Sequence, residues 1–178
     1  MPYSDAQGKD WALATYLSIA PSTVIDIGAG AGTYAKLMRP HHEAHWTAIE
    51  AWFPYVTEFD LDDLYDQVTI ADVRHLGWNQ QVVDMAIAGD VLEHMTRTEA
   101  SELIRWLKAI AKALLVSIPV LHLDQDAVNG NPFERHVDHW TYEAMLAELG
   151  PGVVDTWRGD VLAYYWWTRP DQHGKGTG

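Results

Sequence analysis

The feature that most constrains the fold is a glycine-rich turn that follows the first β-branched run of the chain. Residues 23–27 read Thr-Val-Ile-Asp-Ile, and glycines follow at alternate positions, Gly28, Gly30 and Gly32. Glycine lets the main chain turn sharply and lets a ligand approach without a Cβ in the way. In an open α/β sheet, ligands bind at the carboxyl ends of the strands. A tight turn without a ligand is the alternative, but three glycines after an acid favour a ligand site.

Short β-branched runs alternate with helical segments along the chain. Beyond residues 23–27, strands are expected at 45–50, 67–70, 82–88 and 113–118. The last two runs are almost continuously apolar, as expected for strands that are buried on both faces. This alternation indicates βαβ units and a parallel sheet with helices on both faces, so an α/β fold is predicted.

Two segments show the apolar spacing of a helix. Residues 97–111 repeat apolar side chains at i, i+3, i+4, i+7 and i+10 from Ala100. Thr98 is the expected N-cap of this helix, with Glu99 in its first turn. Residues 6–19 are expected to form another helix, whose buried face carries Trp11, Leu13, Ala14, Leu17 and Ser18.

The C-terminal part of the chain has a different pattern. Residues 140–149 are expected to be helical and to end at Gly150-Pro151. Runs at 153–157 and 161–167 are separated by three residues, which predicts an antiparallel hairpin. Residues 120–139 have no clear period and form a long loop, a type of segment that often carries function.

Composition limits the classes of protein that the chain can belong to. The 178 residues predict one domain over 1–169, and the tail 170–178 is expected to be disordered because it has no apolar anchor. A net charge of −13 disfavours a surface that tracks phosphates, and the absence of cysteine excludes disulfides and thiol chemistry. The chain has neither a long apolar run nor a signal-peptide pattern, so a soluble cytoplasmic protein is expected.

Acids accompany the ends of the first three expected strands. Asp26 precedes the glycine turn, where it would repel a pyrophosphate and suit a cationic ligand, and the dinucleotide fingerprint fails at Thr33. Glu50 could accept hydrogen bonds from both hydroxyls of a ribose. Asp72 could accept from an exocyclic amine while Val73 packs on a base. These acids fit a ligand with an amine, a ribose and an adenine.

Together with Gly89-Asp90-Val91-Leu92-Glu93-His94, these motifs resemble those of class I S-adenosylmethionine-dependent methyltransferases over residues 20–120. The resemblance implies a Rossmann-like, seven-stranded sheet in the order 3-2-1-4-5-7-6 with strand 7 antiparallel. It also implies S-adenosyl-L-methionine as the cofactor and S-adenosyl-L-homocysteine as the product. Trp52 fits ordinary helix–sheet packing as well as cofactor binding. The cofactor site implied by the resemblance is Asp26, Gly28, Ala29, Gly30, Gly32, Glu50, Ala51, Trp52, Asp72, Val73, Asp90 and Val91.

Transfer of a methyl group to a hydroxyl or a protonated amine also removes a proton from the acceptor. His136, in the long loop, is the preferred acid/base candidate, and His94 is the second. Arg135 could hold a carboxylate or phosphate of the substrate, and Glu93 is a further substrate-binding candidate. The alternatives are a solvated loop and a capping role for Glu93 and His94.

A divalent metal is an alternative that the pattern does not favour. Asp90, Glu93 and His94 resemble a metal site of ubiquinone-biosynthesis-type O-methyltransferases. A second set of ligand types consists of His122, His136 and His139. The same acidic sequence motif is common in family members for which no metal is implied, and histidines in loops are usually only polar residues. No metal ligand is therefore assigned.

The leading hypothesis is methyl transfer to an oxygen or nitrogen atom of a small molecule. The alternatives are a cofactor-binding subunit without catalysis and a methyltransferase that acts on a protein or a nucleic acid. The negative charge disfavours nucleic acid. No membrane partner is expected. Trp166 and Trp167 should point to opposite faces of a strand, so one of them could contribute to a homodimer contact.

Overall fold

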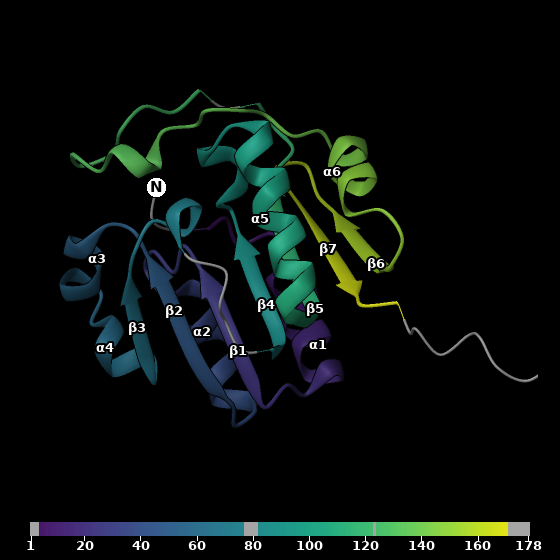
Figure 1. Ribbon diagram of the computed structural model, residues 1–178, viewed down its shortest axis with the longest axis horizontal. Helices are drawn as coiled ribbons and strands as arrows, with labels where there is room; N and C mark the ends of the chain where they lie inside the picture. The colour runs from purple at the N-terminus through teal and green to yellow at the C-terminus, as the bar shows by residue number, and fades with distance from the viewer. Residues whose placement is uncertain (1–3, 77–81, 123, 171–178) are drawn as a thin grey trace, which may run out of the picture.

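The computed structural model describes residues 4–76, 82–122 and 124–170, and its centre is one seven-stranded sheet (Figure 1). The strands are β1 (Thr23–Ile27), β2 (His45–Glu50), β3 (Gln67–Ile70), β4 (Val83–Gly89), β5 (Ala111–Pro119), β6 (Val153–Arg158) and β7 (Leu162–Thr168). Their order is β3-β2-β1-β4-β5-β7-β6. Strands β1 to β5 pair in parallel, and β7 is antiparallel to β5 and β6. The predicted Rossmann-like order and the antiparallel seventh strand are confirmed.

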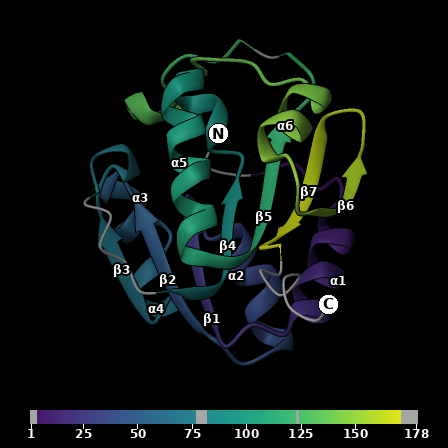
Figure 2. The ribbon, with the colours of Figure 1, turned by 45° about the vertical axis from the view of Figure 1, so that its right-hand side comes forward.

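Helices cover both faces of this sheet, as predicted. Helices α5 and α6 lie on one face, and α1 and α2 lie on the other (Figures 1 and 2). The helices are α1 (Lys9–Ile19), α2 (Thr33–Met38), α3 (Phe53–Glu58), α4 (Leu61–Leu64), α5 (Arg97–Ile110) and α6 (Tyr142–Leu149). Short 3₁₀ turns are η1 (Arg39–His41), η2 (Val73–His75), η3 (Leu92–His94) and η4 (Pro132–Glu134).

Strand residues alternate between two apolar cores. In β5, Leu114 and Val116 belong to the core beneath α5, whereas Leu115 belongs to the core beneath α1 and α2. In β4, Ala86 and Ile87 divide in the same way. Successive side chains of a strand point to opposite faces, so a strand covered on both faces must be apolar throughout. This explains the continuous apolar runs in the sequence.

The β5 strand begins two residues before its expected start, because α5 runs into it without a loop. Ile110 ends the helix, and Ala111 is already paired with Val83 of β4. Ala111 is fully buried, but neither Ala111 nor Lys112 carries the β-branched side chain that marks a strand in the sequence. Pairing with β4 therefore extends the strand beyond its local signal.

The buried face expected for helix α1 is wrong. The buried residues are Ala12, Thr15 and Tyr16, whereas Leu17, which was expected inside, is 43% exposed. Apolar residues lie all around this helix, so their spacing does not select a face. The ring of Tyr16 packs on that of Trp46 in β2, with 5.7 Å between the centroids, and this contact orients the helix.

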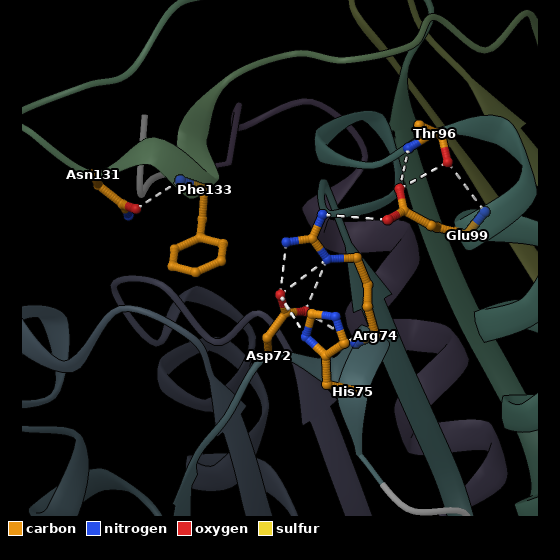
Figure 3. Close-up of polar contacts among 7 residues, drawn as sticks. All are labelled: Asp72, Arg74, His75, Thr96, Glu99, Asn131 and Phe133. Atoms are coloured by element: carbon orange, nitrogen blue, oxygen red, sulfur yellow. Dashed lines mark hydrogen bonds and ion pairs between the residues drawn. The ribbon is translucent and has the colours of Figure 1, made fainter.

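The N-cap expected for helix α5 is also wrong. The helix begins at Arg97, and its N-cap is Thr96 rather than Thr98. The Thr96 hydroxyl accepts a hydrogen bond from the Glu99 main-chain N–H at 3.3 Å, and the Thr96 N–H donates to Glu99 Oε2 at 2.8 Å (Figure 3). This reciprocal capping box places the start of the helix two residues before the position that a Thr98 cap implies.

The C-terminal hairpin of β6 and β7 and the helix before it are confirmed. In β7, Trp167 is buried and Trp166 is half-buried. The predicted tail falls outside the described residues except for Pro170.

None of the helices in the described segments has the length and apolar character required to cross a bilayer.

Replacing Thr96 with Ala should lower the free energy of unfolding by about 1 kcal/mol, because the cap hydrogen bonds of α5 are lost. Urea denaturation of Thr96→Ala and of Thr98→Ala would measure the effect. Thr98 is exposed inside the first turn, so its replacement should change stability by less than about 0.5 kcal/mol. Equal losses in the two variants would contradict the assignment of the cap.

Candidate functional site

A pocket lies at the carboxyl ends of the central parallel strands, below residues 124–139, which cross the top of the sheet in Figure 1. It is partly open to solvent, and its space of about 870 Å³ includes solvent at its mouth. Its walls come from the segments after β1, β2, β3 and β4 and from the 3₁₀ turns η3 and η4. The lining includes Gly28, Ala29, Gly30, Glu50, Ala51, Asp72, Val73, Asp90, Val91 and His94.

The glycine turn brings bare main chain to this pocket. Gly28 has a φ of +67°, and a Cβ there would lie 2.8 Å from Cγ2 of Val91. A larger residue would therefore meet both backbone strain and a clash. Gly32 plays a different part, because it does not line the pocket and a Cβ there would lie 2.2 Å from Cδ2 of Leu64. The first two glycines border the pocket, and the third permits close packing of α4.

Glu50 ties the end of β2 to the glycine turn. Its carboxylate accepts hydrogen bonds from the main-chain N–H of Gly30 at 2.9 Å and of Trp52 at 2.7 Å. The residue is 5% exposed, and burial raises the pKa of its carboxyl group although these hydrogen bonds lower it. Glu50 therefore presents a fixed acceptor to the pocket, whereas the Trp52 side chain is not part of the described lining.

Asp26 is buried and does not line the pocket. It is 2% exposed and accepts a hydrogen bond from the Tyr65 hydroxyl at 2.6 Å. Burial raises the pKa of Asp26 to about 7, against the opposing effect of the hydrogen bond from Tyr65. The acid that was expected to border the ligand thus faces the side of the sheet on which α4 and Tyr65 pack.

Asp72 is held by the residue two positions after it (Figure 3). The guanidinium of Arg74 donates to both oxygens of Asp72, from Nε at 2.9 and 3.0 Å and from Nη2 at 2.6 Å. Burial favours a higher pKa for Asp72, but the hydrogen bonds and charge of Arg74 outweigh it and lower that pKa. Phe133 of η4 faces this pair, with its ring centroid 5.9 Å from the guanidinium carbon.

Asp90 connects the pocket to a buried polar network. Its Oδ1 accepts from the Ser117 hydroxyl at 2.7 Å, and Ser117 in turn shares a 2.8 Å hydrogen bond with Tyr34. The ammonium of Lys9 donates to Tyr34 at 3.3 Å and to Tyr164 at 2.7 Å. Burial lowers the pKa of Lys9 to about 8, although the negative charge of Asp90 opposes this effect.

This network could not be found from the sequence, because its members come from α1, α2, β5 and β7 and share no local spacing.

The catalytic candidates come together beside the pocket. His94 lines it, and the His136 ring lies next to the His94 ring with 5.1 Å between the centroids, although His136 is outside the described lining. Glu93 is 3% exposed and does not belong to the pocket lining. Arg135 is largely exposed and pairs with Asp126 at 3.6 Å. The structure therefore places His94 at the pocket and the expected substrate-binding pair, Glu93 and Arg135, outside its lining.

The metal-ligand sets considered from the sequence are assembled differently in space. Within the described segments, the potential ligand atoms of Glu93, His94 and His136 lie within 4.8 Å of one another. Asp90 does not belong to this group. His122 and His139 form a separate pair of rings, with centroids 4.8 Å apart.

The loop contributes residues that the sequence did not single out as ligand contacts. Asn131, Phe133 and Glu134 line the pocket at η4, and Tyr55 lines it from α3. The Tyr55 hydroxyl donates to Oε1 of Glu134 at 3.0 Å, which anchors the loop above β2. Because residues 120–139 have no clear period, their sequence does not indicate which side chains face inward.

Acidic groups dominate the electrostatics of the pocket. Its carboxylates are Glu50, Asp72, Asp90 and Glu134. Arg74 is engaged with Asp72, and burial is the main cause that lowers the pKa of His94, so this imidazole is neutral at pH 7. The arrangement favours a cationic or hydroxyl-rich ligand and opposes a pyrophosphate.

Comparison with known proteins shows that the chain matches the model of one protein family. The model of a family described as a methyltransferase domain matches residues 25–115, just over half of the chain. No curated protein matches the sequence significantly.

Solved structures share the fold at low identity. Magnesium protoporphyrin IX methyltransferase from Synechocystis PCC 6803, solved with bound SAH, is 18% identical with a TM-score of 0.68, over 92% of this chain and 82% of that chain. A methyltransferase dependent on S-adenosylmethionine from Clostridium acetobutylicum ATCC 824 is 11% identical with a TM-score of 0.68, over 93% and 92%. The N-terminal domain of EvdMO1, solved in the presence of SAH and D-fucose, is 14% identical with a TM-score of 0.67, over 93% and 84%.

Replacing Asp26 with Asn should change how stability depends on pH. Because the pKa of Asp26 is about 7 in the folded protein and 3.8 as its ordinary value, the folded state binds this proton more tightly than the unfolded state. Its contribution to stability is therefore present at pH 4 and is lost as the pH rises towards 7. The stability of the wild type relative to Asp26→Asn should fall by on the order of 3–4 kcal/mol over this range.

Urea denaturation at a series of pH values would measure this difference. Asp62→Asn, at an exposed position of α4, is the matched control. A difference between wild type and Asp26→Asn that does not vary with pH, or one that Asp62→Asn reproduces, would contradict the burial argument.

Proposed function

The chain belongs to the methyltransferase-domain family, and on that premise we propose that it moves a methyl group from S-adenosyl-L-methionine to an oxygen or nitrogen atom of a small molecule. The observation that carries the proposal is the acid-lined pocket beside the glycine turn. The donor is a positively charged sulfur nucleoside, so carboxylates attract it where they would repel a dinucleotide pyrophosphate. Proteins of similar fold were crystallised with SAH, which supports the same ligand here.

The residues present fit each part of such a donor. Glu50 is held by two backbone donors and retains lone pairs that can accept from the ribose hydroxyls. We place the adenine between Val73 and Phe133, beside Asp72, since these side chains offer apolar surface next to a hydrogen-bond acceptor. The bare main chain at Gly28 and Gly30 permits close approach of the amino-acid part. When bound, the donor supplies an electrophilic methyl group.

The protein must align the acceptor, exclude water and remove a proton. An acceptor oxygen or nitrogen that takes up this methyl group would also have to lose a proton. The proton of the acceptor then needs a base. His94 is neutral because its pKa is lowered, chiefly by burial, and it lines the pocket, so the acceptor proton can pass to its imidazole or to that of His136 beside it.

A small acceptor fits the surroundings of the pocket better than a polymer. Residues 124–139 pass over the pocket and are anchored there by the hydrogen bond from Tyr55 to Glu134. The formal charge of −13 disfavours a nucleic-acid backbone. Arg135 is exposed on the same loop, close to His94, and we propose that it meets an anionic group of the acceptor.

Replacing Glu50 with Ala should weaken binding of S-adenosyl-L-methionine by about 1–3 kcal/mol, because charged hydrogen bonds to the ligand are lost. Isothermal titration of each variant with the methyl donor would measure the change. Glu43→Ala removes a carboxylate before the opposite end of β2 and should bind like the wild type. Unchanged affinity in a folded Glu50→Ala variant would refute the assignment of the ribose.

Replacing His94 with Ala should lower turnover by roughly 10²–10⁴-fold and leave donor affinity within a few-fold, because proton removal is lost while the donor wall is retained. Release of S-adenosyl-L-homocysteine with a panel of phenols, sugars and amines would first identify an acceptor and then compare the variants. His45→Ala, at an exposed position where β2 begins, is the control. Full turnover in His94→Ala would contradict a role in proton removal.

A further inference from the structure

Two buried carboxylate oxygens near the pocket lack a hydrogen-bond donor. Among the residues that the structure describes, neither Oδ2 of Asp90 nor Oε2 of Glu93 has a hydrogen-bond partner. Glu93 is 3% exposed, and the Asp90 carboxylate is close enough to repel it electrostatically. A buried carboxylate is costly unless a cation or hydrogen-bond donors compensate it. Both oxygens are therefore available to a cation or to a hydrogen-bond donor that reaches them.

Two imidazoles face the same place as Glu93. Nδ1 of His94 lies 3.1 Å from the main-chain oxygen of Arg135. Because a carbonyl oxygen only accepts, Nδ1 must carry the proton, and in the neutral ring, which the lowered pKa of His94 favours, Nε2 carries a lone pair. The potential ligand atoms of Glu93, His94 and His136 lie within 4.8 Å of one another. The group thus offers one carboxylate and two imidazoles to a single point.

Main-chain hydrogen bonds hold the two segments that form this group together. The N–H groups of Val137 and Asp138 donate to the carbonyl oxygen of Glu93 at 2.8 and 3.2 Å. The N–H of His136 donates to the carbonyl oxygen of Gln125 at 2.9 Å, within the same loop. The convergence of residues 93–94 with residue 136 is therefore built into the backbone and does not depend on exposed side chains.

We propose that Glu93, His94 and His136 bind one divalent ion of the first transition series, of the Zn²⁺ type. Two imidazoles and a carboxylate suit these ions, whereas Mg²⁺ and Ca²⁺ favour sets made of oxygen atoms. The hydrogen bond from His94 to the Arg135 carbonyl is the outer contact that orients a metal-binding histidine. Asp90, whose charge acts on Glu93, is a further carboxylate that can balance the charge of the ion.

The ion would change the role of the two histidines, and this consequence rests on the proposed methyl transfer. His94 is shared between the metal group and the pocket lining, so the ion sits at the pocket wall. Imidazoles that bind a metal cannot act as free bases at the same nitrogen. An acceptor hydroxyl that reaches the ion would then lose its proton more readily, because a divalent ion lowers the pKa of a bound oxygen.

Titration of the full chain with Zn²⁺ after treatment with a chelator, in the absence of methyl donor, tests the site directly. The wild type should bind one Zn²⁺. When Co²⁺ is used in place of Zn²⁺, the bound ion should show the visible absorption of cobalt with nitrogen and oxygen ligands. His136→Ala and Glu93→Gln should each bind Zn²⁺ at least about 10-fold more weakly. His139→Ala, in the separate histidine pair of the same loop, should bind like the wild type.

The variants are compared only after circular dichroism shows that they are folded. If the Glu93→Gln variant does not fold, because the substitution is buried, His136→Ala alone decides the outcome. Lack of Zn²⁺ binding by the wild type, or wild-type affinity in His136→Ala, would overturn the proposal. Loss of binding in His139→Ala with retention in His136→Ala would do the same. None of these results affects the titration with S-adenosyl-L-methionine, so failure of the metal site and failure of the proposed function are distinguishable.

Discussion

The carboxylate of Glu50 is the interaction on which the geometry of the site depends. It binds the N–H of Gly30 in the turn after β1 and the N–H of Trp52 after β2, while the Gly28 N–H donates to the Ile49 carbonyl at 2.8 Å. Loss of these donors would leave the buried Glu50 carboxylate uncompensated, which is costly, so the two hydrogen bonds hold the glycine turn against the end of β2. The pocket is therefore defined by main chain and one acid before any ligand binds.

The sequence predicted the fold well because the strand signals coincide with burial. β1, β2 and β3 have the expected bounds, and β4 and β5 read as apolar because helices cover both their faces. Spacing also located the carboxyl ends of the strands, and hence the pocket. Spacing did not predict which side of the sheet faces the ligand. Asp26 alternates with Ile25 and Ile27, so its side chain points to the opposite side of the sheet, where it accepts a hydrogen bond from Tyr65.

Contacts between distant segments account for what spacing could not predict. The network of Lys9, Tyr34, Ser117 and Asp90 joins separate elements, and no local pattern marks its members. The approach of His136 to His94 depends on hydrogen bonds between the loop and η3. The N-cap of α5 was misassigned for a local reason, since two threonines compete for the cap and the extended backbone of Thr96 lets it take that position.

Selectivity for charge is the central claim, and one pair of titrations tests it most directly. The wild-type chain is titrated at low ionic strength with S-adenosyl-L-methionine and, separately, with NAD, which carries an adenosine on a pyrophosphate. The acid-lined pocket predicts a single site for the sulfonium nucleoside and binding of NAD that is weaker by at least about a factor of ten. Tighter binding of NAD, or no binding of the sulfonium compound, would contradict the account.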